Sequence, residues 1–173
     1  MHVRWLIPLG AAVASPVALA TQYLSVPQAQ QEAFPGAGEF RAVPVPDAAA
    51  LAAIGAPAGW APQIFEADAG AKKLGWLIVD QVIGKSEAIT YALALDTAGA
   101  VISLEVLEYR ESHGGEVRMP AWRKQFVGKT AADAVALSRE IKIISGATLS
   151  CRHLTEGVQR LLRLYALALR APA

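Results

Sequence analysis

Three consecutive segments with the features of β-strands, joined by short connections, constrain the fold of this chain most strongly. Residues 73–84 (KLGWLIVDQVIG) are apolar enough for a central strand. In residues 88–95 every second side chain is apolar and would lie on one face of a strand: Ile89, Tyr91, Leu93 and Leu95. A turn signal at residues 96–99 leads into residues 101–110, where the side chains expected on one side are Ile102, Leu104 and Val106. Such short connections predict antiparallel pairing.

The C-terminal part has the pattern of one long helix, from about residue 149 to residue 170. Apolar side chains recur there at helical spacing: Leu154, Val158, Leu161, Leu162, Tyr165 and Leu169. The other side carries Arg152, Arg160, Arg163 and Arg170. We interpret these arginines as a solvated helix face rather than a docking surface. Shorter helices are expected at residues 118–126 and 131–139, the second capped by Thr130. Strands followed by helices predict an α+β fold, with a small antiparallel sheet, packed helices and a long C-terminal helix.

The segment before the strands is expected to hold two short helices. Ser25 can cap a helix, and Gln28 can reach back as the second half of a capping box, which predicts a helix ending near Phe34. The following stretch, residues 35–62, is rich in Ala, Pro and Gly. We expect it to be a surface loop with one brief helix near residues 47–54.

The first twenty residues have the layout of a secretory signal. Arg4 supplies a positive start, and an apolar stretch runs to the small residues of Ala18-Leu19-Ala20. The stretch is shorter than the roughly 20 residues of a membrane-spanning helix, and Pro8 and Pro16 interrupt it. We expect cleavage after Ala20, with retention as an inner-membrane anchor as the alternative. In both cases the rest of the chain would be exported to the periplasm.

Length and charge limit the remaining possibilities. A chain of 173 residues can bury the core of one domain, and a formal net charge of +1 gives no overall attraction to nucleic acid. The expected division is residues 1–20 (signal or anchor), 21–62 (N-terminal helix and Ala/Pro/Gly-rich segment) and 63–173 (the main domain). The single Cys151 allows no intramolecular disulfide, and its thiol is expected to be buried.

One short segment has the features of a ligand site. Ser145-Gly146-Ala147-Thr148 follows the apolar, strand-like Ile143-Ile144 and precedes the long helix. Small side chains let a bulky group approach the backbone, and a helix N-terminus favours an anion. The Thr148 hydroxyl is therefore well placed to carry or contact a phosphate. In the alternative interpretation, which spacing alone favours, Ser145 and Thr148 only cap the helix.

Several other patterns are excluded by their residues. Gly84-Lys85-Ser86 is similar to the end of a phosphate loop, but Val79 stands where the first glycine is required. Ser145 does not lie in a nucleophile-elbow motif, and CxxC and CxxCH motifs are absent from the sequence. His113 has no second His or Cys at metal-ligand spacing, so no metal site is expected.

The segment 145–148 resembles the flavinylation motif of the FMN-binding domain family. That family includes the covalently flavinylated subunits of the sodium-pumping NADH:quinone oxidoreductase and of the Rnf electron-transport complex. Residues 108–116 (EYRESHGGE) resemble the family's strand-to-glycine-loop element, and residues 120–129 (PAWRKQFVGK) its Trp–Phe–Gly segment. The three elements occur in the family's order, and the resemblance covers about residues 74–169. It implies that the main domain, residues 63–173, is an FMN-binding domain.

The resemblance implies that a flavin transferase attaches FMN through a phosphoester to Thr148, the last residue of the motif. Ser145, Gly146 and Ala147 would then form the loop at the attachment point. The sequence departs from the family at one position, because Lys142 stands where an Asp is usual, three residues before the serine. A non-covalent FMN site is the alternative that this departure leaves open.

The resemblance also implies roles for the other matched elements. Gly114 and Gly115 would let the backbone approach the isoalloxazine ring, although an ordinary turn would explain them equally. Trp122 would stack on the flavin or shield it, or else belong to the core. Glu111 and His113 would form hydrogen bonds with ring atoms or steady the glycine loop. Two basic residues, Lys142 and Arg152, would balance the phosphodiester charge.

The function implied is electron transfer rather than stand-alone catalysis. An exported flavoprotein would relay electrons between a membrane reductase or quinone-linked partner and an exocytoplasmic acceptor. A second hypothesis is a secreted binding module of the same fold without covalent flavin, which Lys142 favours. A third, weaker hypothesis is a flavin enzyme with its own small substrate.

Overall fold

The computed structural model describes residues 21–170 and shows a six-stranded antiparallel sheet with the strand order β1-β6-β5-β4-β3-β2. The expected signal or anchor, residues 1–20, lies outside the described residues. The strands are β1 (Thr21–Gln22), β2 (Glu39–Val43), β3 (Gln63–Ala69), β4 (Lys72–Ile83), β5 (Ala88–Asp96) and β6 (Val101–Tyr109). The three strands predicted from the sequence are confirmed as β4, β5 and β6.

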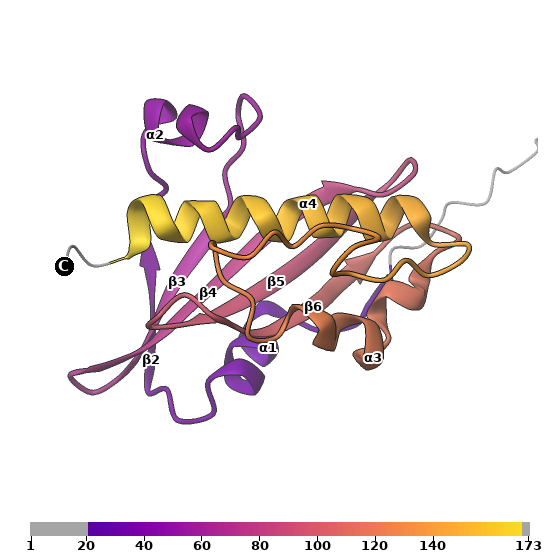
Figure 1. Ribbon diagram of the computed structural model, residues 1–173. Coiled ribbons are helices and arrows are strands. Elements are labelled where there is room, and N and C mark those ends of the chain that lie inside the picture. The colour runs from indigo at the N-terminus through magenta and orange to yellow at the C-terminus, as the bar shows by residue number, and fades with distance from the viewer. Residues whose placement is uncertain (1–20, 171–173) are drawn as a thin grey trace, which may run out of the picture.

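Helices cover both faces of the sheet (Figure 1). The α-helices are α1 (Val26–Ala33), α2 (Ala48–Ala53), α3 (Pro120–Arg123) and α4 (Thr148–Leu164). The shorter helical turns are η1 (Gly115–Arg118), η2 (Lys124–Phe126) and the π-helical η3 (Tyr165–Leu169). The long helix α4 lies across one face, and α1 packs on the opposite face. This arrangement confirms the predicted α+β fold with its long C-terminal helix.

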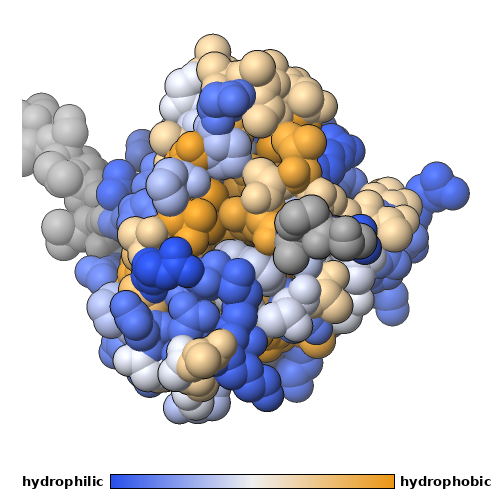
Figure 2. Space-filling model, turned by 90° about the vertical axis from the view of Figure 1, so that its left-hand side faces the viewer, coloured by the Kyte–Doolittle hydropathy of each residue, from blue (hydrophilic) through white to orange (hydrophobic). Residues whose placement is uncertain are grey.

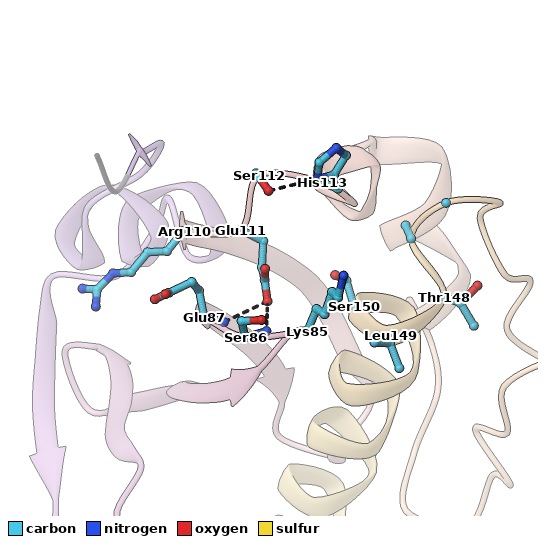
Figure 3. Close-up of a pocket in the computed structure, with 12 residues that line it drawn as sticks. Lys85, Ser86, Glu87, Arg110, Glu111, Ser112, His113, Thr148, Leu149 and Ser150 are labelled. Atoms are coloured by element: carbon cyan, nitrogen blue, oxygen red, sulfur yellow. Dashed lines mark hydrogen bonds between the residues drawn. The ribbon is translucent and has the colours of Figure 1, made fainter. Parts of the chain in front are cut away.

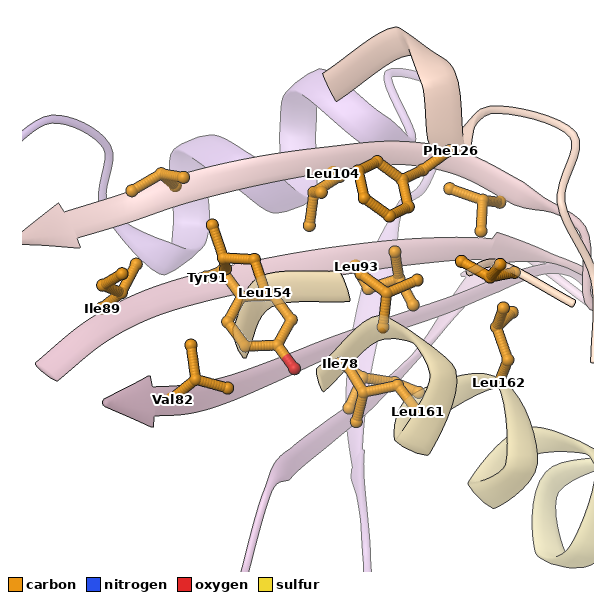
Figure 4. Packing of buried hydrophobic residues seen from close by; sticks show 14 of the residues in the cluster. Ile78, Val82, Ile89, Tyr91, Leu93, Leu104, Phe126, Leu154, Leu161 and Leu162 are labelled. Carbon is orange, nitrogen blue, oxygen red and sulfur yellow. The ribbon is translucent and has the colours of Figure 1, made fainter. Parts of the chain in front are cut away.

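The main core lies between α4 and the sheet (Figure 4). The alternating residues Ile89, Tyr91, Leu93 and Leu95 of β5 are all fully buried there, as their period of two predicts. Leu154 and Leu161 of α4 pack against them and are also fully buried. Burial of such side chains stabilises the fold by about 1.5–3 kcal/mol each. The same helix packs tightly against the sheet at Gly157, where an added Cβ would lie 2.4 Å from the Tyr91 hydroxyl oxygen.

Two bulges in β6 change which of its side chains face α4. Leu95 pairs with Val101 but Ala94 pairs with Ser103, so Ile102 is an extra residue between them. Val101 and Leu104 therefore face the core under α4, whereas Ile102 packs on the opposite face beside α1. The expectation that Ile102 shares a side with Leu104 is wrong, because one inserted residue reverses the alternation.

The segment before β3 is partly as predicted. Helix α1 begins after Ser25 with the full capping box to Gln28, and α2 begins after Asp47, whose side chain accepts from Ala50 N–H. Within residues 35–62, however, β2 replaces part of the expected loop and pairs along its whole length with β3. Neither strand was predicted from the sequence. β2 is mostly exposed and carries little apolar alternation, which explains why the pattern did not reveal it.

The expected helices before α4 are corrected by the structure. Residues 118–126 form η1, α3 and η2 in succession rather than one helix. Residues 131–139 form no helix, because Thr130 and Asp133 close a single turn through their side chains. Val135 and Ser138 then take positive φ angles of 39° and 67°, which an α-helix does not allow. The segment instead lies along α4, where the Gln159 side chain donates to the carbonyls of Ala134 and Val135.

One arginine of α4, Arg160, does not lie on the solvated helix face where the sequence predicted it. The Arg160 side chain is only 17% exposed and forms an ion pair with the buried Asp80 of β4 at 3.0 Å. The Trp60 indole and the Tyr91 hydroxyl also donate to this carboxylate, each at 2.7 Å. This cluster attaches the segment after α2 to α4 and the sheet. Arg152, Arg163 and Arg170 are exposed, as expected.

The C-terminal end of α4 is fixed by Tyr165 in η3. Its hydroxyl donates to the Thr97 carbonyl at 2.9 Å, and an added Cβ on Gly99 would lie 2.0 Å from its ring. Seen from this end of the molecule, apolar side chains form a band between α2 and the rest of the domain (Figure 2). Partly buried Leu51 and Leu169 pack there against the core.

Candidate functional site

The segment 145–148 forms a turn that leads directly into α4. Gly146 has a positive φ of 86°, which favours glycine, and Ala147 is the N-cap residue of the helix. No side chain of the described structure caps this helix, so the interpretation of Ser145 and Thr148 as capping residues is wrong. Both side chains are exposed. The first turn of a 17-residue helix therefore presents its backbone N–H groups and the Thr148 hydroxyl together at the surface.

The approach to this turn is held by α3 and η2 instead of by a strand. Trp122 Nε1 donates to the Lys142 carbonyl, and the Lys142 N–H donates to the Gln125 side chain, both at 2.8 Å. The expected strand-like lead-in is wrong, since Ile143 is 40% exposed and lies outside any strand. Lys142 itself, the departure from the family motif, has a fixed backbone and an exposed side chain.

The glycine loop lies directly against the same turn. Gly114 has a positive φ of 87°, and an added Cβ would lie 3.4 Å from Ala147 Cα. Gly115 begins η1. Two sequence elements that are about thirty residues apart are therefore brought into contact, as the resemblance implied for neighbouring parts of one site.

A polar hollow of about 570 Å³ opens on one side of this contact (Figure 3). It is lined by residues 85–87, 110–113 and 146–150. Glu111 accepts hydrogen bonds from the backbone N–H groups of Ser86 and Glu87, so its carboxylate steadies the β4–β5 turn. Burial acts to raise the pKa of Glu111, but the hydrogen bonds from Glu87, Ser86 and Lys85 outweigh it and the pKa is lowered. His113 is exposed, and its Nδ1 pairs with the Ser112 hydroxyl at 2.9 Å.

An apolar hollow of about 360 Å³ lies on the side of α3. Its lining residues are Met119, Ala121, Trp122, Gln125, Lys142, Ile143 and Ile144. Met119 is 53% exposed, although it is a large apolar side chain. Trp122 is buried and makes an edge contact with Phe126, so it belongs to the core and lines the hollow at the same time. The interpretation of Trp122 as a core residue is confirmed, whereas its contact with the flavin stays a prediction.

The structure thus gathers the predicted residues around one point but divides them between two hollows. Gly146, Ala147 and Thr148 line the polar hollow together with Glu111 and His113. Trp122 lines the apolar hollow, and Gly114 and Gly115 lie behind the contact between the loops. Of Arg152 and Lys142, only Lys142 lines either hollow.

Three residues of the site were not singled out from the sequence. Tyr109 and Ser150 join the glycine loop to α4 through their hydroxyl groups, which lie 3.0 Å apart. Their separation of 41 residues gives no local signal. Met119 gave no signal either, because a single methionine before a proline follows no period.

Two kinds of feature are absent from residues 21–170. No helix in this range is both long enough and apolar enough to span a membrane. In the same range, no three His, Cys, Asp or Glu side chains are grouped so that they could bind a metal ion. Cys151 is fully buried, as predicted.

The region that contains this site is similar to known proteins. Residues 84–163 match the family model described as the FMN-binding domain. The chain is also 24% identical over 152 residues to a subunit of the Na⁺-translocating ferredoxin:NAD⁺ oxidoreductase complex of Acetobacterium woodii. That alignment covers 79% of this chain and 72% of the relative. Residues 84–163 are therefore an FMN-binding domain, which has FMN as its cofactor and resembles this component of the Acetobacterium complex.

Proposed function

We propose that the protein is an exported electron carrier that holds FMN through a phosphoester on Thr148. The observation that supports this most directly is the start of α4. Thr148 is exposed at an uncapped helix N-terminus, inside the matched region and on the wall of the polar hollow. Unpaired N–H groups and the helix dipole favour a phosphate at that point. The small residues Gly146 and Ala147 leave room for the rest of the cofactor.

The attachment reaction proposed for Thr148 is a phosphoryl transfer. Its hydroxyl oxygen attacks the FMN phosphorus of an anhydride donor, the flavin dinucleotide FAD, with a flavin transferase as the catalyst. The new bond joins Thr148 Oγ to phosphorus, the anhydride P–O bond breaks, and AMP leaves with the electron pair. The hydroxyl proton goes to solvent. The protein gains the mass of FMN less one water.

The isoalloxazine ring is proposed to lie against the apolar hollow, beside the exposed apolar side chains there. Figure 3 shows the Thr148 side chain pointing away from Glu111 and Ser86. Met119 and Ile143 offer exposed apolar surface for an aromatic ring, and Trp122 forms part of the same wall. Glu111 is committed to the backbone of the β4–β5 turn, which favours its role of steadying the loop over a contact with the ring.

Electron transfer follows from the cofactor and from the relative. FMN accepts one or two electrons, while the protein supplies orientation and shielding. The relative belongs to an oxidoreductase complex, which supports a membrane-bound redox partner for this chain. Export would follow from residues 1–20, cleaved after Ala20 or retained as an inner-membrane anchor. The domain would then work on the outer side of the membrane.

The test is the intact mass of the exported protein, made together with a flavin transferase. We expect the mass of FMN less one water to be added, with flavin fluorescence that survives denaturation. Thr148→Ala should lose both signals, whereas the control Thr97→Ala should keep them, because the Thr97 side chain is exposed in the β5–β6 turn, at the opposite end of α4. An unmodified wild-type protein that still binds free FMN would contradict the phosphoester but not the cofactor.

A second candidate function, a secreted binding module of this fold without covalent flavin, is favoured by Lys142. This position carries a base instead of the usual acid and lines the apolar hollow. Lys142→Asp separates the two functions. If wild-type protein is unmodified and the variant gains FMN, the binding module is the better description of the natural chain.

A further inference from the structure

A single phenol joins three elements of the site. Tyr109 ends β6, and its hydroxyl donates to the His113 carbonyl in the glycine loop at 2.5 Å. The same oxygen lies 3.0 Å from the Ser150 hydroxyl in the first turn of α4. A phenol has one hydrogen, which goes to His113, so the Ser150 hydroxyl is the donor of the second bond. Tyr109 and Ser150 are each only 4% exposed.

The contact leaves no space for a side chain on the glycine loop. A Cβ added to Gly114 would lie 2.8 Å from the Tyr109 hydroxyl and 3.0 Å from the Ser150 hydroxyl. Burial raises the pKa of Tyr109, so the phenol keeps its hydrogen and goes on donating at neutral pH. Since no side chain caps α4, the Tyr109–Ser150 bond is the side-chain hydrogen bond that fixes its first turn to the rest of the site.

We propose that Tyr109 is a positioning residue for flavin attachment: by binding His113 and Ser150 together, its hydroxyl sets the place of the Thr148 hydroxyl. This inference rests on the proposed phosphoester at Thr148. Ser150 is two residues beyond Thr148 in the same helical turn, so movement of one moves the other. Transfer to an acceptor hydroxyl depends on its placement to within about 1 Å, and a misplacement of that size costs up to about 100-fold in rate.

The kinetic test compares Tyr109→Phe with Tyr165→Phe. Tyr165 is a matched control, because it is also 4% exposed, and its hydroxyl likewise donates to a backbone carbonyl, at the far end of α4. With FAD and a purified transferase, Tyr109→Phe should slow attachment at saturating FAD by about tenfold or more, with KM for FAD unchanged. Tyr165→Phe should attach FMN at the wild-type rate. Ser150→Ala should behave like Tyr109→Phe, and Ser150→Thr, which keeps the hydroxyl, should restore the rate.

Hydrogen–deuterium exchange provides a readout that does not need flavin. Tyr109→Phe should speed exchange in residues 112–118 and in residues 145–151 together, while Tyr165→Phe should leave both segments unchanged. Wild-type exchange and wild-type attachment in Tyr109→Phe would overturn the inference. If wild-type protein gains no FMN, the proposed phosphoester on Thr148 is wrong. Independently of flavin, if Tyr109→Phe does not speed exchange in both segments together, the role of Tyr109 in joining them is wrong.

Discussion

Glu111, which was expected to bind ring atoms of the flavin or to steady the glycine loop, binds the backbone of the β4–β5 turn in the structure. Its carboxylate accepts N–H groups from the β4–β5 turn, and its pKa is lowered despite burial, which acts in the opposite direction. A lowered pKa in the folded state contributes stability above the unfolded-state pKa, near 4.5. That contribution is lost as the pH falls through the folded-state value.

We therefore expect Glu111→Gln to reduce the free energy of unfolding at pH 7 by about 0.5–1 kcal/mol, since the group is partly solvent-screened. The difference from wild type should shrink as the pH is lowered from 7 to about 3, because the Glu111 carboxylate takes up protons as the pH approaches its lowered pKa. Urea unfolding at the two pH values measures this. Glu87→Gln, at an exposed position in the same turn, should match wild type at both. An equal reduction of the free energy of unfolding at both pH values would contradict the link between stability and the ionisation of Glu111.

Outside the flavin site, we expect substitution of Asp80 to lower the free energy of unfolding most. It is buried and accepts from Trp60, Tyr91 and Arg160, so Asp80→Asn leaves the Arg160 charge without its partner. We expect Asp80→Asn to lower the free energy of unfolding, measured with urea, by about 2–4 kcal/mol. Glu156→Gln, on the exposed side of α4, is the neutral control. The double variant Asp80→Asn, Arg160→Met should lose less than the sum of the two single losses.

At the scale of elements, the sequence predicted most of the segments that follow a regular period or a local cap. The alternation in β5, the apolar β4, the capping box of α1 and the apolar stripe of α4 are all local patterns, and each is present. Two of the failures depend on non-local partners. β2 exists because β3 offers it a pairing edge, and the bulge at Ile102 appears only in the pairing with β5.

In the candidate site, too, local motifs could be predicted from the sequence and contacts between distant residues could not. The loop around Thr148 and the glycine loop were found because each is a local motif that resembles a family. The division into two hollows and the bond between Tyr109 and Ser150 required the fold, since residues 41 positions apart meet there.

The packing of α4 on the sheet predicts an unusual response to a helix-favouring substitution. Gly157→Ala would raise helix propensity by about 1 kcal/mol on an exposed helix. Here the new Cβ would lie 2.4 Å from the Tyr91 hydroxyl, so we expect a net destabilisation of about 1–3 kcal/mol. Thermal unfolding followed by circular dichroism measures it, and Glu156→Ala at the neighbouring exposed position should be neutral or stabilising. Stabilisation by Gly157→Ala would show that α4 can move away from β5.

At the scale of the whole molecule, the proposed function predicts electron exchange with a membrane partner. Reduced, flavin-loaded protein should be reoxidised when it is mixed with membranes of its host and an electron acceptor, as followed by recovery of flavin absorbance. Thr148→Ala protein should show no such signal, because it carries no attached flavin. Reduced protein that stays reduced with every membrane fraction would count against the relay.

The position of α4 after strands β3 to β6 in the chain has a consequence for the time at which the site forms. Strands β3 to β6 are neighbours in sequence and can pair as the chain is synthesised. The acceptor Thr148 follows these strands in the chain, so its turn can form only after Tyr109 and the glycine loop that hold it have been made. A transferase that recognises the assembled surface would therefore act only on finished chains, and bound flavin would mark those that had completed folding.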